Sequence, residues 1–302
     1  MGCVQHGAAR EETRRRGQGV KRQNYTAQGG RLRLMVGDMA KRLTALQAWR
    51  RREFQLIIAD PPYNIGVEYG SGHDDKAPAW LFEAQLAEWC RIIAGGIQPG
   101  GHAVLVLPPK LSPIAFMALR AAGMEWVNTT AWCYRFGQCQ CSRFISAHVD
   151  GLVFTQPGAK RIWNPDPIME PSDRLTTYAD PRVETSKDGG LRVPLDWFTG
   201  PFLGRIQGQN AERSTDHQNQ LPERYVAAFV HSLSLPGGLV CDPFSGSGTT
   251  GAVCNTLERR FIGCELGPSQ AAASWERIKR GAARADRITA WEWNDEGKQC
   301  HD

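Results

Sequence analysis

The sequence predicts an α/β fold in which a doubly wound, mostly parallel sheet is interrupted by an irregular insert. Strand and helix patterns alternate on both sides of a central segment, and this alternation is typical of parallel sheets covered by helices. Residues 156–216 break the alternation, because this segment holds seven of the 18 prolines and shows no steady hydrophobic period. The chain has 302 residues, 41% hydrophobic and 22% charged, which suffices for one large domain with such an insert or for two smaller domains.

The elements before the insert follow from short apolar runs and from helical spacing. The compact run Phe54–Ala59 is typical of a strand buried on both faces. Phe82, Leu86 and Trp89 recur at helical spacing, and a pair of glycines then ends this predicted helix. The predicted strands are residues 31–37, 54–59, 102–107, 125–134 and 149–155, and the other predicted helices begin near Met39 and Leu111.

The same alternation resumes after the insert. Leu221, Tyr225 and Phe229 mark a helix. Strands are predicted at residues 239–241 and 260–264, and helices at 249–257 and 268–282. The expected organisation is a basic disordered tail (1–30), a first domain half (31–155), the insert (156–216), a second half (217–285) and a C-terminal tail (286–302).

The charge of the chain is unevenly distributed. The net charge is +5, and residues 1–30 supply +4 of it through six Lys/Arg against two Asp/Glu. The insert holds eight Lys/Arg against nine Asp/Glu, a net charge of −1. Binding to DNA therefore cannot depend on overall basicity and needs a local patch.

Composition also bears on location and metal binding. No apolar stretch reaches the roughly 20 residues of a membrane helix, and the N-terminus has no apolar signal core. A cytoplasmic protein without membrane contact is expected, and its nine cysteines are expected to be reduced thiols. Cys139 and Cys141 have no second close pair of ligands, so no metal site is expected.

A glycine-containing turn follows the predicted strand 239–241. Gly246 and Gly248 let backbone N–H groups approach a ligand closely at the start of a helix. Glu265 lies 23 residues after Asp242, near the spacing at which an acidic side chain binds ribose hydroxyls. The missing third glycine argues against NAD, and the missing Gly-Lys-Ser/Thr argues against a triphosphate. The pattern favours a nucleoside cofactor; the alternative is a tight turn beside a surface glutamate.

The tetrad Asp60-Pro61-Pro62-Tyr63 follows the buried run 54–59, at the strand end where α/β sheets bind ligands. Proline lacks a backbone N–H, so the Asp60 carboxylate and the Pro61 carbonyl remain as two acceptors. Two fixed acceptors suit an amino group, and Tyr63 offers a face on which its ring can stack. A base in a duplex reaches such a pocket by flipping out. The alternative is an Asp-initiated turn.

Together the tetrad and the loop Phe244–Gly248 resemble the amino-group DNA methyltransferases that use S-adenosylmethionine. That family has the tetrad Asp/Asn/Ser-Pro-Pro-Tyr/Phe and a Phe-x-Gly-x-Gly cofactor loop. The tetrad precedes the loop here, as in the β permutation class, whose target-recognition region lies between the two. The resemblance implies a Rossmann-like methyltransferase fold, a target-recognition role for residues 156–216, and double-stranded DNA as the substrate.

The resemblance also implies a set of cofactor-binding residues. The segment 261–265 resembles the ribose-binding segment of the family, and Asp38 resembles the residue that contacts the cofactor's adenine. The segment 217–222 resembles the family's His-Pro-x-Gln/Lys-x-Pro, although Gln218 replaces its proline. The residues expected to bind the cofactor are Asp38, Gln220, Asp242, Phe244, Gly246, Ser247, Gly248, Thr249 and Glu265.

The expected reaction is direct methyl transfer to the exocyclic amine, with Asp60, Pro61, Pro62 and Tyr63 as the catalytic residues. Methylation of a cytosine carbon needs a thiolate nucleophile. In enzymes of that kind the cysteine follows a proline, and no cysteine here does. The family tendency links Asp at the first tetrad position with adenine N6, and cytosine N4 is the alternative. Methylation of RNA or protein is a further alternative, as is an inactive DNA-binding module.

Contacts to DNA are the least determined by the sequence. Trp132, Arg135, Arg143, Lys160 and Arg161 are expected to contact the substrate, against the simpler alternatives of core packing and solvated charge. Three insert residues are further candidates for phosphate or guanine contacts: Arg174, Arg192 and Arg205. The class also suggests a cognate restriction endonuclease or a homodimer as partners, and a bacterial, archaeal or phage-encoded origin.

Overall fold

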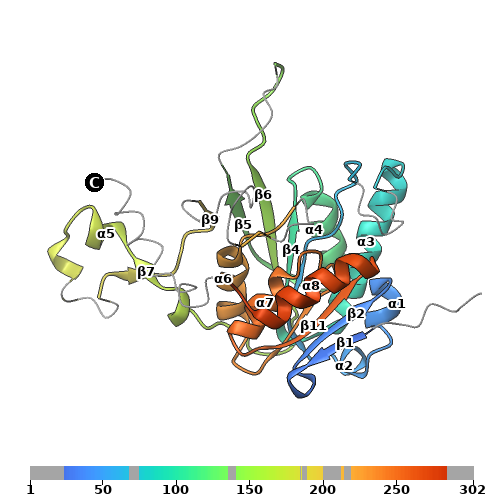
Figure 1. Ribbon diagram of the computed structural model, residues 1–302. Coiled ribbons are helices and arrows are strands. Elements are labelled where there is room, and N and C mark those ends of the chain that lie inside the picture. Colours follow the sequence, from blue (N-terminus) through green and yellow to red (C-terminus); the bar gives the residue numbers. More distant parts are fainter. Residues whose placement is uncertain are drawn as a thin grey trace, which may run out of the picture.

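A computed structural model describes residues 24–67, 75–134, 141–183, 185, 189–199, 212–213 and 219–283. Within these residues the central feature is a nine-stranded sheet with the order β1-β2-β11-β10-β3-β4-β6-β5-β9 (Figure 1). Its strands are β1 (Asn24–Ala27), β2 (Leu32–Val36), β3 (Phe54–Ala59), β4 (Ile97–Leu107), β5 (Glu125–Cys133), β6 (His148–Thr155), β9 (Trp197–Phe198), β10 (Leu239–Asp242) and β11 (Arg260–Glu265).

The sheet is mostly parallel, as predicted. The five strands β2, β11, β10, β3 and β4 lie in this order and pair in parallel with one another. Strand β6 is antiparallel to both β4 and β5, and β1 is antiparallel to β2 at one edge. Strand β9 pairs in parallel with β5 at the other edge.

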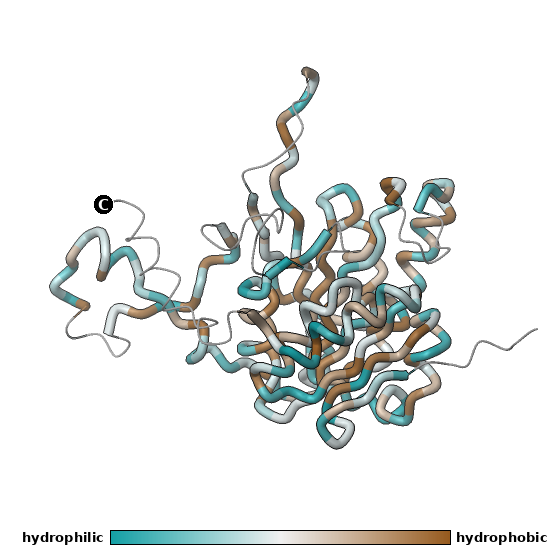
Figure 2. Tube along the Cα trace, viewed as in Figure 1, coloured by the Kyte–Doolittle hydropathy of each residue, from teal (hydrophilic) through white to brown (hydrophobic). Residues whose placement is uncertain are grey.

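Helices cover both faces, which confirms the predicted doubly wound arrangement. Leu56 and Ile58 of β3 belong to one hydrophobic core, which also contains side chains of α6 (Glu223–Leu233), α7 (Thr249–Thr256) and α8 (Pro268–Arg280). The alternate residues Ile57 and Ala59 belong to a second core, with side chains of α1 (Met39–Leu43), α2 (Gln47–Arg50), α3 (Ala79–Gly96) and α4 (Ser112–Ala121). Figure 2 shows hydrophobic residues running along these central strands.

The strand order reverses between β10 and β3. These neighbours pair in parallel, with Val240 opposite Leu56 and Cys241 opposite Ile57. From β10 the chain continues through α7 to β11 on one side, and from β3 through α3 to β4 on the other. Such a reversal leaves a crevice beyond the carboxyl ends of the two strands. Both sequence motifs begin at this point of the sheet.

The N-terminal boundary differs from the prediction. Residues 24–27 form β1 and Gln28–Gly30 form a short 3-10 turn, so the expected disordered tail is wrong for residues 24–30. The physical reason is tertiary: β1 pairs with β2, and the Tyr25 ring stacks on Trp275 with 5.6 Å between centroids. Residues 1–23 and 284–302, which include the rest of both expected tails, lie outside the described residues.

The insert is irregular in its described part, as predicted. Its elements are short: η2 (Asp166–Ile168), β7 (Glu170–Pro171), α5 (Asp173–Thr176), η3 (Pro181–Val183) and β8 (Leu191–Arg192). Figure 1 shows α5 and β7 on a lobe beside the main sheet. The expectation that the insert does not continue the sheet is wrong for β9, because Trp197 and Phe198 add an edge strand.

Cysteines in the described residues are free thiols, of which Cys90, Cys241, Cys254 and Cys264 are buried. Cys139 lies outside the described residues. In the part of the chain that the structure describes, no three His, Cys, Asp or Glu side chains gather as metal ligands would. None of the described helices has both the length and the hydropathy of a membrane span.

Candidate active site

A pocket of about 220 Å³ lies beyond the carboxyl ends of β2, β3, β10 and β11. All four residues of the tetrad Asp60–Tyr63 line it, together with the loop 242–247 and Glu265. The predicted meeting of residues 60 and 246 is therefore present, although they are far apart in the chain. The sheet explains it, because parallel strands end at one edge and β3 lies beside β10.

Hydrogen bonds join the first and last residues of the tetrad and fix the segment that follows it. The Tyr63 hydroxyl donates to Oδ1 of Asp60. After the tetrad, the carboxylate of Asp75 accepts backbone N–H bonds from Asn64 at 2.9 Å, Ile65 at 3.1 Å and Val67 at 2.9 Å. Asp75 is buried, and it holds the segment that follows the tetrad in one conformation. Sequence reasoning missed Asp75, because nothing in its local pattern shows which N–H groups it meets.

The acidic groups of the pocket have perturbed pKa values. Burial raises the pKa of Asp60 to about 7, with a further increase from the nearby Asp242 and a partial opposite effect of the Tyr63 hydrogen bond. Burial likewise raises the pKa of Asp242 to about 6. The pKa of Glu265 is raised by burial, against the opposing effect of its backbone hydrogen bonds. Burial is the largest cause of all three shifts, and carboxylates with raised pKa values that line one pocket mark it as a candidate functional site.

The glycine turn is held by carboxylates. Glu265 accepts N–H bonds from Gly246 at 2.9 Å and from Gly267 at 3.0 Å. Asp242 accepts the N–H of Phe244 at 3.0 Å. Both carboxylates thus face the backbone of the turn, at the ends of β10 and β11.

Gly248 serves a different purpose from the one expected. It is absent from the pocket lining, has a φ of +79°, and stands directly before α7. A Cβ at this position would lie 2.8 Å from the Ser274 carbonyl oxygen and 2.7 Å from its hydroxyl. The glycine is therefore needed for the close approach of α7 to α8, and its expected direct contact with the cofactor is not supported by this geometry.

Two other predicted cofactor residues have different outcomes. Asp38 lines the pocket and also caps α1, since its carboxylate accepts the Lys41 N–H at 3.2 Å. Gln220 is a correction: its side chain is absent from the lining, and its amide donates to the Glu212 carbonyl. Its two neighbours in the chain, Asn219 and Leu221, line the pocket instead. Gln85 and Gln270, which sequence reasoning missed, line it as well.

Trp132 is a core residue and not a wall of the pocket. It is 6% exposed, belongs to the hydrophobic core below α6, and contacts the Tyr225 ring at 6.1 Å and the Tyr134 ring at 5.4 Å between centroids. The expected role in the base pocket is therefore wrong. Alternation along β5 indicates that Trp132 points to one face, but not what lies on that face.

Lys160 and Arg161 lie at the wrong edge of the sheet for the predicted substrate contacts. The next residue, Ile162, donates its N–H at 2.9 Å to the carbonyl of Gly100, which lies in the N-terminal half of β4. Asp60 follows the opposite end, since Ala59 pairs with Leu105. Strand β6 is antiparallel to β4, so it ends at the edge of the sheet that faces away from the pocket.

The remaining candidates for DNA contact are unevenly described. Arg143 is exposed in the connection between β5 and β6, which leaves the sheet at the pocket edge. Arg174 pairs with Asp180 at 3.0 Å, and Arg192 pairs with Glu170 at 3.2 Å, so both have acidic partners inside the insert. Arg135 and Arg205 lie outside the described residues.

The chemistry of the lining distinguishes between classes of cofactor. Four carboxylates line the pocket, and the described lining residues include no lysine or arginine: the acids are Asp38, Asp60, Asp242 and Glu265. This set does not fit a phosphate group, which needs cationic partners. It fits a cofactor that has hydroxyls for carboxylates to bind and carries a positive charge, as the sulfonium S-adenosylmethionine does.

Comparisons with known proteins agree with this geometry. The chain is 27% identical to the type II methyltransferase M.HpaI of Haemophilus parainfluenzae over 237 residues, which are 78% of this chain and 71% of the relative. It is 27% identical over 262 residues to the DNA adenine methyltransferase YhdJ of Escherichia coli K12, covering 84% and 82% of the two chains.

Solved structures show the same fold. The complex of M1.HpyAVI with S-adenosylmethionine superimposes with a TM-score of 0.57 at 19% identity, covering 81% of this chain and 98% of the other. The PvuII cytosine-N4-specific DNA methyltransferase gives 0.60 at 14% identity, covering 84% and 91%. A family model described as DNA methylase, for N6 and N4 methyltransferases, matches residues 54–276, from the start of β3 into α8. This match spans more than half of the chain and both motifs, so the chain belongs to the S-adenosylmethionine-dependent N6/N4 DNA methylase family.

Proposed function

We propose that this DNA methyltransferase is site-specific and transfers a methyl group to N6 of adenine in a base flipped out of the duplex. One observation carries the proposal: the two acceptors of Asp60 and Pro61 lie in the same pocket as the glycine turn. The alternative of an inactive DNA-binding module is disfavoured, because the tetrad, the turn and Glu265 are all present and share this pocket.

The residues of the pocket divide into two groups by what they can bind. Glu265 is placed to bind ribose hydroxyls, Asp38 to bind the adenine of the cofactor, and the turn at Gly246 and Ser247 to pack against the remainder. When bound, S-adenosylmethionine supplies an electrophilic methyl group on a positively charged sulfur. The four carboxylates of the lining make the pocket favourable for that charge.

The tetrad is proposed to hold the target amine. The Asp60 carboxylate and the Pro61 carbonyl accept its two N–H bonds, which leaves the nitrogen lone pair free to react. Tyr63 is tethered to Asp60 by its hydroxyl and presents its ring to the base. Positioning and exclusion of water then contribute most of the rate, and no covalent bond to the protein is needed.

Adenine is favoured over cytosine by the aspartate in the first tetrad position and by similarity to a protein named as an adenine methyltransferase. The cytosine-N4-specific PvuII enzyme, which shares the fold, makes N4 of cytosine the second candidate. Incubation of the protein with labelled cofactor and plasmid DNA, followed by nucleoside analysis, decides between them. N6-methyladenine is the expected product, and N4-methylcytosine alone would refute this part of the proposal.

Activity is expected to rise with pH around neutrality. The ionised Asp60 carboxylate accepts an N–H bond more strongly than the neutral acid and stabilises the positive charge that develops on the amine, and burial raises its pKa to about 7 in the ligand-free protein. The value of kcat/KM, which reports the free enzyme, should therefore increase about tenfold between pH 6 and pH 8. Steady-state rates across this range measure it. A profile that is flat from pH 6 to pH 8 would contradict the assigned role of the carboxylate.

Glu265→Gln is expected to weaken cofactor binding. The substitution keeps the size of the side chain but removes the charge that accepts ribose hydroxyls, which predicts a roughly 10- to 100-fold increase in Kd. Calorimetric titration with S-adenosylmethionine measures the Kd without DNA. Glu276→Gln is the matched control, because Glu276 is an exposed residue of α8 that pairs with Lys279. Equal affinities of the two variants would remove Glu265 from the cofactor site.

A further inference from the structure

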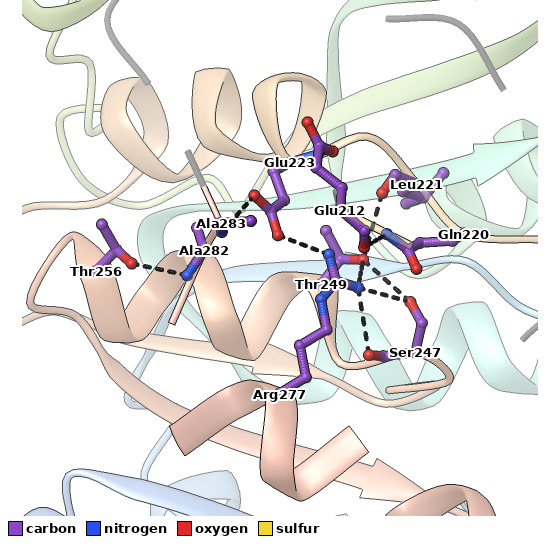
Figure 3. A network of polar contacts seen from close by, with 10 residues as sticks. All are labelled: Glu212, Gln220, Leu221, Glu223, Ser247, Thr249, Thr256, Arg277, Ala282 and Ala283. Atoms are coloured by element: carbon purple, nitrogen blue, oxygen red, sulfur yellow. Dashed lines mark hydrogen bonds and ion pairs between the residues drawn. The ribbon is translucent and has the colours of Figure 1, made fainter. Parts of the chain in front are cut away.

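A buried arginine lies behind the cofactor turn and has no place in the mechanism above. Arg277 of α8 is 3% exposed, and its Nη2 forms an ion pair with Oε1 of Glu223 at 2.7 Å. Glu223 is 0% exposed at the start of α6. Figure 3 shows the guanidinium between Glu223 and the residues Ser247 and Thr249.

The other end of the guanidinium binds the turn directly. Nη1 of Arg277 donates to the Thr249 hydroxyl at 2.8 Å, to the Ser247 hydroxyl at 3.2 Å and to the Ser247 carbonyl at 3.3 Å. Ser247 and Thr249 line the pocket, whereas Arg277 does not. The arginine therefore holds the turn from the side that faces away from the pocket.

Glu223 connects the same arginine to a second wall of the pocket. It follows the segment in which Asn219 and Leu221 line the pocket. The Thr249 hydroxyl also donates to the Leu221 carbonyl at 3.3 Å, so the two walls meet behind the cavity. The N–H of Glu223 donates to the carboxylate of Glu212, near the end of the insert, at 3.0 Å.

Stability alone is a weak reason for this arrangement. A buried ion pair loses in desolvation much of what it gains in attraction, and well-packed apolar residues often replace it without loss. A planar guanidinium with several fixed donors is, in contrast, well suited to hold several oxygens in defined positions. Here the oxygens belong to Ser247 of the turn and to Thr249 at the start of α7, and both residues line the pocket.

We propose that Arg277 is a positioning residue for cofactor binding, with Glu223 as its counter-charge. It fixes the hydroxyls of Ser247 and Thr249 and the carbonyl of Ser247, and thereby sets the shape of the turn that receives the cofactor. The inference rests on the proposed function only where that function assigns the turn at Ser247 to the cofactor site.

The test removes the ion pair without leaving a buried charge. The double variant Glu223→Met/Arg277→Met replaces both partners by apolar side chains, and the exposed Ala283 N–H, which donates to Glu223 at 2.9 Å, can bond water instead. We expect a folded protein with a cooperative thermal transition. Its Kd for S-adenosylmethionine should rise roughly 10- to 100-fold in calorimetry without DNA, because charge-assisted bonds to the turn are lost. The KM for the cofactor should rise while the KM for DNA stays unchanged.

The matched control is Arg259→Met. Arg259 is also buried, at 5% exposure, and its guanidinium donates to the carbonyls of Ser234 at 2.9 Å and Leu257 at 2.8 Å. It precedes β11, so it lies at the sheet edge away from the pocket. This variant should lose stability and keep the wild-type Kd, which separates general destabilisation from positioning.

A double variant that folds and binds the cofactor with wild-type Kd overturns the proposal. If it does not fold, Arg277→Lys decides, because lysine keeps the charge beside Glu223 but lacks the fork that also reaches Ser247 and Thr249. Weaker binding at an unchanged Tm then supports the proposal, and an unchanged Kd overturns it. A wild-type chain that binds the cofactor but methylates no DNA would refute the proposed function and leave this inference intact.

Discussion

Asp60→Asn is expected to reduce the rate of methyl transfer about 10²- to 10³-fold and, at pH 8, to make the ligand-free protein more stable. The rate falls because the amide replaces one of two acceptors by a group that also donates, and it lacks the charge that stabilises the amine as it becomes positive. Asparagine has nearly the same shape and can still accept the Tyr63 hydroxyl. The pocket should therefore keep its form, and the loss should appear in the chemical step and not in cofactor binding.

The gain in stability follows from the raised pKa. Asp60 has a pKa of about 7 when folded, against an ordinary value of 3.8 when unfolded. Between these values the folded state binds the proton of Asp60 more tightly, so the contribution of Asp60 to the stability of the wild-type protein falls as pH rises from about 4 to 7. At pH 8 the full penalty of a buried carboxylate is present, on the order of 1–3 kcal/mol after allowance for solvent screening. Asparagine has no such penalty.

Single-turnover methylation and thermal unfolding at pH 5 and pH 8 check both parts. The difference in Tm between the variant and the wild-type protein should be larger at pH 8 than at pH 5. Glu83→Gln, which neutralises an exposed carboxylate of α3, serves as the control and should change neither quantity. Methyl transfer by Asp60→Asn at a rate near that of the wild-type protein would refute the catalytic assignment.

The parts of the fold that sequence predicted are those in which local pattern and tertiary position agree. The run 54–59 predicts a buried strand and residues 239–241 predict a second strand, and each is followed at once by a motif. The parallel sheet then places both motifs at one edge without further information. For this reason the site could be predicted from two short segments, although neither segment alone indicates the other.

The substrate residues failed because their positions depend on strand direction. Lys160 and Arg161 follow β6, and its antiparallel direction places them at the edge opposite the pocket. The hydrophobic pattern of a buried strand is the same whichever way the strand runs. The pattern therefore does not show at which edge of the sheet the strand ends. The prediction that Trp132 lines the base pocket was wrong for a similar reason, since alternation along β5 does not reveal that Tyr225 packs against it.

Buried charges were missed for a related reason. Glu223 and Arg277 are charged residues in helices, and such residues are usually exposed. Glu276, the neighbour of Arg277 in α8, is indeed exposed. The burial of Glu223 and Arg277 arises only where α6, α7 and α8 meet behind the glycine turn. Strand β1 was missed because a short polar segment becomes a strand when an edge such as β2 accepts it.

Gly248→Ala is expected to lower the free energy of unfolding by about 2–5 kcal/mol and to weaken cofactor binding in consequence. An alanine in the left-handed region costs roughly 1–2 kcal/mol by itself. The new Cβ would in addition lie 2.8 Å from the Ser274 carbonyl oxygen, which is backbone and cannot rotate away. Relief of this contact requires α7 and α8 to separate, at a further cost of about 1–3 kcal/mol.

Comparison with Gly237→Ala isolates the cost of the contact between the new Cβ and α8. Gly237 has a similar φ of +71°, but a Cβ there meets nothing within 4 Å. It should therefore cost only the backbone contribution of roughly 1–2 kcal/mol and leave the Kd for S-adenosylmethionine unchanged. Chemical denaturation and calorimetric titration of both variants measure the two quantities. Equal losses of stability would show that close contact between α7 and α8 is not what position 248 requires. A larger loss for Gly248→Ala, accompanied by weaker binding, would mean that this glycine supports the cofactor turn through helix packing without touching the cofactor.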